Sequence, residues 1–256
     1  MQRRPLPLLL LALLPLAAPA QELAESPDGW TGTGELGLAM ARGNSRSESL
    51  NTRLRLAHET EGWKNSFNAS ALRTRAEVSG DFDGDGTPER RYQTSANRYD
   101  VAGATAYRFD PRNHLSGSAR YEHNDFASYE YQGTVALGYG HRFVDNERTK
   151  FSGEIGPGYR RARLADDGEV QSSLIGRAAL ELRHQLTDNT ELFNSLLVES
   201  GKDNTFAQND LGLSVAMNEH FALKAGLQTR HNTEVEEADI KRTDTLTTVN
   251  LVYTFR

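Results

Sequence analysis

The segment DFDGDGTPER, residues 81–90, places acidic side chains at alternate positions of a short, glycine-containing stretch. Carboxylate oxygens spaced in this way are suitable ligands for Ca²⁺, which takes several oxygen ligands from a flexible loop. An EF-hand is excluded, because Tyr92 stands where that motif needs its last glutamate. The segment therefore predicts a calcium site of another kind, with the ligands Asp81, Asp83, Asp85 and Glu89.

Two interpretations of this loop stay open. The segment resembles the D-x-D-G-D-G-x-x-D calcium loops that join strands in integrin-type repeats, with Glu89 in place of the last aspartate. In that case calcium orders the loop and takes part in no reaction. Alternatively, the acids only keep a turn soluble, because Asp and Gly are common turn residues. The acidic stretch is the tip of a hairpin in both interpretations.

Seven histidines raise the question of ester hydrolysis. A hydrolase of this kind needs a nucleophilic hydroxyl, a histidine base and an acid or amide that orients the base. The sequence contains no G-x-S-x-G segment and neither H-E-x-x-H nor H-x-x-E-H. These absences favour a non-enzymatic protein, with a lipid-modifying hydrolase of the outer membrane as the alternative.

The N-terminus MQRRPLPLLLLALLPLAAPA, residues 1–20, has the three parts of a secretory signal peptide. Residues 21–29 would then form a short periplasmic segment, and residues 30–256 the folded domain. The chain has no cysteine, so disulfides contribute nothing to its stability. The formal net charge of -6 becomes -8 when the two arginines of the signal are removed, which argues against a nucleic-acid partner.

The stretch YEYQGTVALGYGHRF, residues 129–143, alternates apolar side chains with small or polar ones. Val135, Leu137 and Tyr139, for example, are separated by single small residues. A period of two identifies a strand with one apolar and one polar face. The stretch is longer than the usual strand of about five or six residues, which favours a membrane strand over a soluble one.

The same alternation recurs along the chain and predicts twelve strands. Their connections alternate between short turns, such as residues 110–113, and longer polar loops, such as residues 201–209. We therefore expect an all-β fold, a transmembrane antiparallel β-barrel with short periplasmic turns and longer extracellular loops. Closure leaves no unpaired strand edge in lipid. The alternative is a soluble secreted calcium-binding β-protein.

In such a barrel, the charged side chains that share the polar parity face the lumen. They form either a narrow, mildly anion-preferring pore or a salt-bridged plug. The predicted lumen-lining residues are Arg53, Arg55, Arg98, Arg120, Glu122, Glu130, Arg142, Glu154, Arg160, Arg177, Glu181, Arg183, Lys224 and Arg230.

Aromatic residues near the short turns predict a girdle at the membrane interface. The expected girdle residues are Trp30, Trp63, Tyr107, Phe109, Phe143, Phe151, Phe193 and Phe221. A girdle implies outer-membrane lipids and lipopolysaccharide as partners.

Three segments carry a family resemblance: WTGTGELGLAMARGNSRSESL, GEIGPGYR and the terminal NLVYTF. Residues 30–256 resemble the domain-of-unknown-function 481 family, commonly labelled salt-induced outer-membrane proteins. The resemblance implies a porin-like barrel in the outer membrane of a Gram-negative cell, linked to salt or osmotic conditions. It implies no site residues. Periplasmic chaperones and the barrel assembly machinery would be partners during export, and Phe255 stands next to the C-terminus as an assembly signal.

Overall fold

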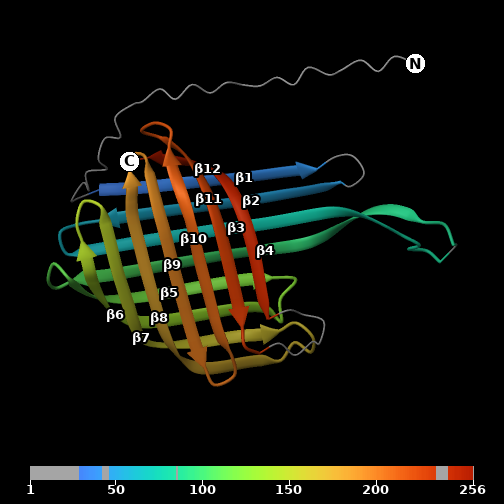
Figure 1. The fold of residues 1–256 in the computed structure, drawn as a ribbon. Coiled ribbons are helices and arrows are strands. Elements are labelled where there is room, and N and C mark those ends of the chain that lie inside the picture. The colour runs from blue at the N-terminus through green and yellow to red at the C-terminus, as the bar shows by residue number, and fades with distance from the viewer. Residues whose placement is uncertain (1–28, 42–45, 85, 235–241, 256) are drawn as a thin grey trace, which may run out of the picture.

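The computed structural model describes residues 29–41, 46–84, 86–234 and 242–255. The expected signal peptide, residues 1–20, and residues 21–28 of the expected periplasmic segment lie outside this part of the chain. The described residues form a closed barrel of twelve antiparallel strands (Figure 1). The strands are β1 (Gly29–Ala41), β2 (Ser47–Glu59), β3 (Trp63–Gly80), β4 (Glu89–Arg108), β5 (Asn113–Asn124), β6 (Tyr129–Asp145), β7 (Thr149–Leu164), β8 (Val170–Thr187), β9 (Thr190–Gly201), β10 (Thr205–Ala216), β11 (Phe221–Asn232) and β12 (Thr243–Phe255).

The two faces of the barrel wall are inverted relative to a soluble protein. Apolar side chains such as that of Leu174 point outward, and this residue is 80% exposed. Charged side chains point inward, and Glu199 is only 1% exposed. Because side chains alternate along a strand, one apolar parity covers the whole outside and one polar parity fills the inside. This arrangement suits a bilayer, and the soluble alternative does not fit it. Among the described residues, no helix has the length and apolar character to span a membrane.

Every strand pairs with its neighbours in sequence, and β1 pairs with β12 to close the ring. The closing seam is short. Within the described residues it runs only from Gly32 opposite Phe255 to Leu36 opposite Leu251. The remaining length of β1 pairs with β2 alone, and that of β12 with β11 alone.

The side chain of Asn250 lies where the pairing of β1 with β12 ends. Asn250 donates a hydrogen bond to Glu35 at 3.2 Å and accepts one from Asn51 at 3.3 Å. Gly37 leaves the necessary room, because a Cβ there would lie 2.2 Å from Asn250 Oδ1. Side-chain bonding by Asn250 thus continues the contact between the two edges where backbone pairing stops.

Short turns join the strands on one rim. The turn after β4 is typical: the Asp110 carboxylate accepts hydrogen bonds from the Asn113 side chain at 2.7 Å and from the Arg112 and Asn113 amides at 2.7 and 2.8 Å. These bonds, the one from the Asn113 side chain first, hold the pKa of Asp110 below its ordinary value.

Longer loops join the strands on the other rim. One of them differs in length from the sequence prediction. The loop expected at residues 201–209 is shorter, because β10 already begins at Thr205. Phe206 is completely buried and packs inside the barrel, so this stretch is held in the wall as strand.

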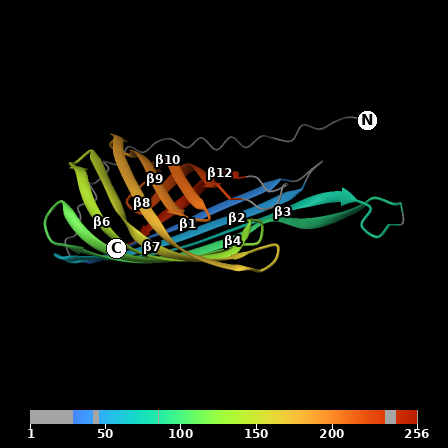
Figure 2. The same cartoon turned by 90° about the horizontal axis from the view of Figure 1, so that it is seen from below.

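The β3–β4 hairpin projects well beyond the rim of the barrel, as both views show (Figures 1 and 2). Its two strands stay paired out to Gly80 opposite Glu89, with a bulge between Thr74 and Arg75. The predicted calcium loop is the tip of this hairpin.

Aromatic pairs surround the short-turn rim. Trp63 packs on Tyr107, and Phe143 packs on Phe151, each with ring centroids 5.1 Å apart. These are residues of the expected girdle. Phe193, which was also expected in the girdle, does not belong to it. Its side chain shares the inward parity of β9, and its ring lies 4.5 Å from the Lys224 ammonium in the lumen.

Candidate functional site

A cluster of ion pairs crosses the lumen near the long-loop rim. This loop-side cluster consists of Arg120 and Glu122 on β5, Glu199 on β9, Phe206 on β10 and Arg230 on β11. Arg120 donates to Glu122 at 2.9 Å and to Glu199 at 2.8 Å. The second oxygen of Glu122 accepts a bond from Arg230. Since β5 and β11 lie on opposite sides of a twelve-strand ring, these bonds span the barrel.

Phe206 is the apolar centre of the loop-side cluster. Its residue is 0% exposed, and two guanidinium groups lie over the ring, with the Arg120 and Arg230 Cζ atoms 4.8 and 5.0 Å from the ring centroid. A cation over an aromatic face is stabilised by the quadrupole of the ring, more strongly where water is excluded. The cluster therefore combines charge pairing with apolar filling.

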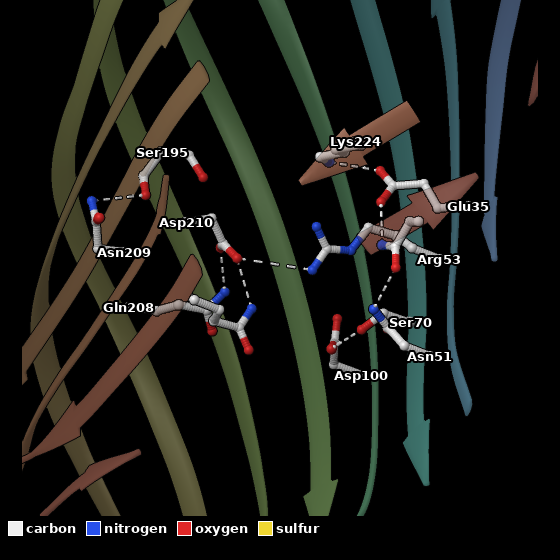
Figure 3. Close-up of polar contacts among 12 residues, drawn as sticks. Glu35, Asn51, Arg53, Ser70, Asp100, Ser195, Gln208, Asn209, Asp210 and Lys224 are labelled. Atoms are coloured by element: carbon white, nitrogen blue, oxygen red, sulfur yellow. Dashed lines mark hydrogen bonds and ion pairs between the residues drawn. The ribbon is translucent and has the colours of Figure 1, made fainter. Parts of the chain in front are cut away.

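A second group of charged side chains lies around Glu35. Its carboxylate accepts hydrogen bonds from Arg55 at 2.9 Å and from Lys224 at 2.8 Å, both to the same oxygen. Beside it, Asp210 accepts bonds from Gln208 and Gln228, each at 2.8 Å. The figure shows these groups facing one another across the lumen (Figure 3).

Arg53 lies between these two acids. Its Nη2 atom reaches toward Asp210 at a distance of 4.0 Å (Figure 3). Arg98 is on the same side and donates to Gln228 at 2.7 Å. Arg53 and Arg98 line a common cavity of about 30 Å³, which holds no more than a few small species.

A third group of polar side chains packs against glycines of β6. Glu154 is paired with Arg177 and lies 3.6 Å from His114 Nε2. A Cβ at Gly138 would lie 2.7 Å from the Glu154 side chain, and one at Gly140 would lie 2.0 Å from the His114 ring. The small residues of β6 thus leave the space that these two side chains occupy.

The remaining predicted lumen residues occupy different places. Arg160 is 3% exposed and donates to the Asn204 carbonyl at 3.2 Å. Arg142 pairs with Asp145 near the short-turn rim at 2.6 Å. Glu181 and Arg183 share the inward parity of β8, opposite Ser195 and Phe193 of β9.

Glu130 departs from the prediction. It lies within a bulge between Tyr129 and Tyr131, where the pairing with β7 shifts by one residue. Its side chain is 42% exposed and approaches Arg163 at 3.4 Å, on a strand where the neighbouring Leu164 is buried inside. Because the bulge reverses the parity, Glu130 lies on the outer face.

Sequence reasoning missed several lumen residues, including Glu199 and Phe206. The alternation on β9 is hidden, because Leu196, Leu197 and Val198 are apolar on both faces. Asp210 is also absent from the predicted lumen residues. Its inward parity with Gly212 and Ser214 was the available signal.

The predicted calcium loop is organised by its own hydrogen bonds. Asp81 accepts bonds from the Gly84 amide at 2.7 Å and from the Gly86 amide at 2.9 Å. Glu89 pairs with Arg91 at 2.6 Å. Asp85 lies outside the described residues, and among the residues that are described no group of three acids or histidines could hold a metal ion. The calcium site stays a prediction.

We expect Asp81→Ala to loosen the hairpin tip, with or without calcium, because both carboxylate oxygens hold backbone amides. Losing bonds to a charged group should speed proteolytic cleavage of the tip by roughly tenfold. Limited proteolysis of refolded protein measures this, with Asp166→Ala in the β7–β8 loop as a control. Protection by calcium in the unmodified protein that disappears in Asp83→Ala would instead support the metal site.

The histidines form two pairs with hydroxyl groups. Thr149 contacts His184 Nδ1 at 2.9 Å, and Thr243 contacts His231 Nδ1 at 2.8 Å. Both are cross-strand pairs on the outer face. Within the described residues neither imidazole has a carboxylate partner to orient it.

Comparison with known proteins places the chain in a family. A model described as "Protein of unknown function, DUF481" matches residues 34–255. The chain belongs to this family. The "Uncharacterized protein YdiY" of Escherichia coli strain K12 is 28% identical over 211 residues, which cover 82% of this chain and 77% of that protein.

A solved structure agrees with the fold of this DUF481 member. The COG4313 outer membrane channel from Pseudomonas putida F1 matches with a TM-score of 0.50 at 13% identity, over 93% of this chain and 98% of that one. The translocator domain of the autotransporter NalP from Neisseria meningitidis matches with a TM-score of 0.48 at 14% identity, over 93% and 92%. Likeness at such identity concerns the fold alone. With its apolar outer face, this barrel is an outer-membrane protein.

Proposed function

We propose that this protein is a non-enzymatic, narrow channel of the outer membrane whose lumen is held nearly closed by ion pairs. The observation that carries the proposal is the chain Arg120–Glu122–Arg230, which joins β5 to β11 across the lumen. Charged side chains at a constriction favour one sign of permeant ion and exclude bulky solutes. The channel would therefore pass small ions only.

We propose that the salt-stress link rests on a second, looser ion pair in the lumen. Arg53 and Asp210 face each other at 4.0 Å, with side chains 22% and 18% exposed. The Debye length falls from about 8 Å at physiological salt to about 3 Å at 1 M, so concentrated salt weakens such loose, partly hydrated contacts first. We propose that conductance rises more steeply with salt than the conductivity of the solution does.

The setting of the channel is also proposed. Residues 1–20 are removed on export, residues 21–29 stay in the periplasm, and chaperones and the barrel assembly machinery receive the chain. The outward aromatic pairs, such as Trp63 with Tyr107, would contact lipid headgroups and lipopolysaccharide at the interface.

Conductance in planar bilayers tests the channel. We expect the unmodified protein to show small conductance steps and Glu122→Gln to show steps several-fold larger, because Arg120 and Arg230 lose the carboxylate between them. Glu130→Gln is the matched control, since Glu130 lies on the outer face. Its steps should equal those of the unmodified protein.

Folding is checked separately by the altered gel mobility of the unboiled barrel. If folded Glu122→Gln is as silent as the unmodified protein in every salt, the channel proposal fails and the barrel has a structural role. Lipid hydrolysis by the refolded protein would support the hydrolase alternative.

A further inference from the structure

The cavity beside Arg53 carries an inference that does not depend on conduction. It measures about 30 Å³, and its lining includes Glu35, Arg53, Ser70, Arg98, Asp210 and Lys224. A single water-sized sphere needs roughly 10–15 Å³, so the cavity has room for one compact species and its nearest water. The lining comes from both halves of the ring, so closure of the barrel is what assembles it.

The acids at this cavity are already satisfied. Glu35 accepts bonds from Arg55, Lys224 and Asn250 at 2.8 to 3.2 Å. Asp210 accepts bonds from two glutamine amides, each at 2.8 Å. The carboxylates therefore have little capacity left for a further cation.

The arginines are not satisfied. A guanidinium carries five N–H donors. Among the described residues, Arg53 donates no hydrogen bond and approaches Asp210 at 4.0 Å, and Arg98 donates one bond, to Gln228 at 2.7 Å. The two arginines project from β2 and β4 with only β3 between them, so their side chains can converge on one point above Ser70. Unused donors of two guanidinium groups thus face the same small space.

The net charge of the groups around the cavity also favours an anion. The charged groups that line the cavity or bond to a lining group are the cations Arg53, Arg55, Arg98 and Lys224 and the acids Glu35, Asp210 and Asp100, the last bonded to Ser70. Four positive and three negative charges leave one positive charge in excess. One monovalent anion would neutralise this charge, and it would replace water at guanidinium groups that are only partly hydrated, since the Arg53 side chain is 22% exposed.

We propose that this cavity binds one compact monovalent anion of the halide class, held by Arg53 and Arg98. A single halide ion fits the volume of about 30 Å³, and the two guanidinium groups offer it several N–H donors. Binding would stabilise the barrel, because the site exists only when β2, β4, β10 and β11 are assembled.

Thermal unfolding with bromide as the probe tests the site. Sodium concentration and ionic strength are held constant while bromide replaces gluconate, which is too large for the cavity. We expect the unfolding midpoint to rise by about 2–4 °C or more and to saturate. Arg53→Gln and Arg98→Gln should lose this dependence. Arg161→Gln, at an outward position of β7, is the control and should keep it.

Crystals grown with bromide provide a second, independent measurement. An anomalous peak between Arg53 and Arg98 is expected. Equal midpoints in bromide and gluconate, or a bromide dependence that survives in both glutamine variants, would overturn the proposal. If Arg53→Gln does not fold, Arg53→Lys keeps the charge and should retain a weaker dependence, and the absence of the anomalous peak would still be decisive. A silent channel with a bromide-dependent midpoint would separate this site from the proposed conduction.

Discussion

Replacing Phe206 with alanine should lower the free energy of unfolding by about 3–5 kcal/mol and enlarge the conductance of the barrel. Phe206 is 0% exposed, and the guanidinium groups of Arg120 and Arg230 both lie over its ring. Its removal leaves a cavity at the centre of the loop-side cluster. It also removes two cation–π contacts, each worth about 2 kcal/mol where water is excluded.

Urea unfolding of the refolded protein in detergent, followed by gel mobility, measures the loss, and planar bilayers measure the conductance. Phe206→Leu should lower the free energy of unfolding by less than Phe206→Ala does, because leucine keeps most of the apolar volume and only the aromatic face disappears. Phe126→Ala in the β5–β6 loop is the control, since that ring is 47% exposed and should cost no more than about 0.5 kcal/mol. If Phe206→Ala matches this control, the ring does not hold the cluster together.

The sequence was sufficient for the architecture because one rule governs every strand. Side chains alternate, and a membrane barrel needs an apolar outside and a polar inside. Arg120 and Arg230 could therefore be expected to face inward. The exceptions occur where the rule is interrupted. Glu130 lies in a bulge that shifts the pairing by one residue, and no signal in the sequence marks that bulge.

The partners inside the lumen could not be predicted in the same way. Arg120 and Glu199 are paired, although 79 residues separate them in the chain. Which inward side chains meet depends on the closure of the ring and on the stagger between strands. Alternation along a single strand contains neither. The cavity beside Arg53 depends on both, so it became visible only with the assembled barrel.

A second variant with a large expected effect concerns the wall of the barrel, in the GEIGPGYR segment of β7. A Cβ at Gly156 would lie 1.9 Å from the Leu137 carbonyl oxygen and 2.9 Å from the Gly138 Cα. Both atoms belong to the backbone of β6, which cannot move aside as a flexible side chain can. Gly156 is therefore needed for the close approach of two strands and not for an unusual backbone angle.

Gly156→Ala should consequently destabilise the barrel by about 3 kcal/mol or more, the upper end of the range for overpacking. Gly176→Ala is the matched control, because it lies on the adjacent strand β8 and a Cβ there meets no atom within 4 Å. The yield of refolding from urea, scored as the fraction with folded gel mobility, should fall sharply for Gly156→Ala and stay unchanged for Gly176→Ala.

Equal yields for the two variants would mean that β6 and β7 can separate without loss of closure. Pro157, which follows Gly156, has no N–H to donate to the ladder, and the pairing of β6 with β7 has a gap there, between Ala136–Gly158 and Tyr139–Ile155. With fewer bonds holding the two strands there, the clash with the Leu137 carbonyl is relieved by separating β6 from β7, and the barrel loses closure at that point.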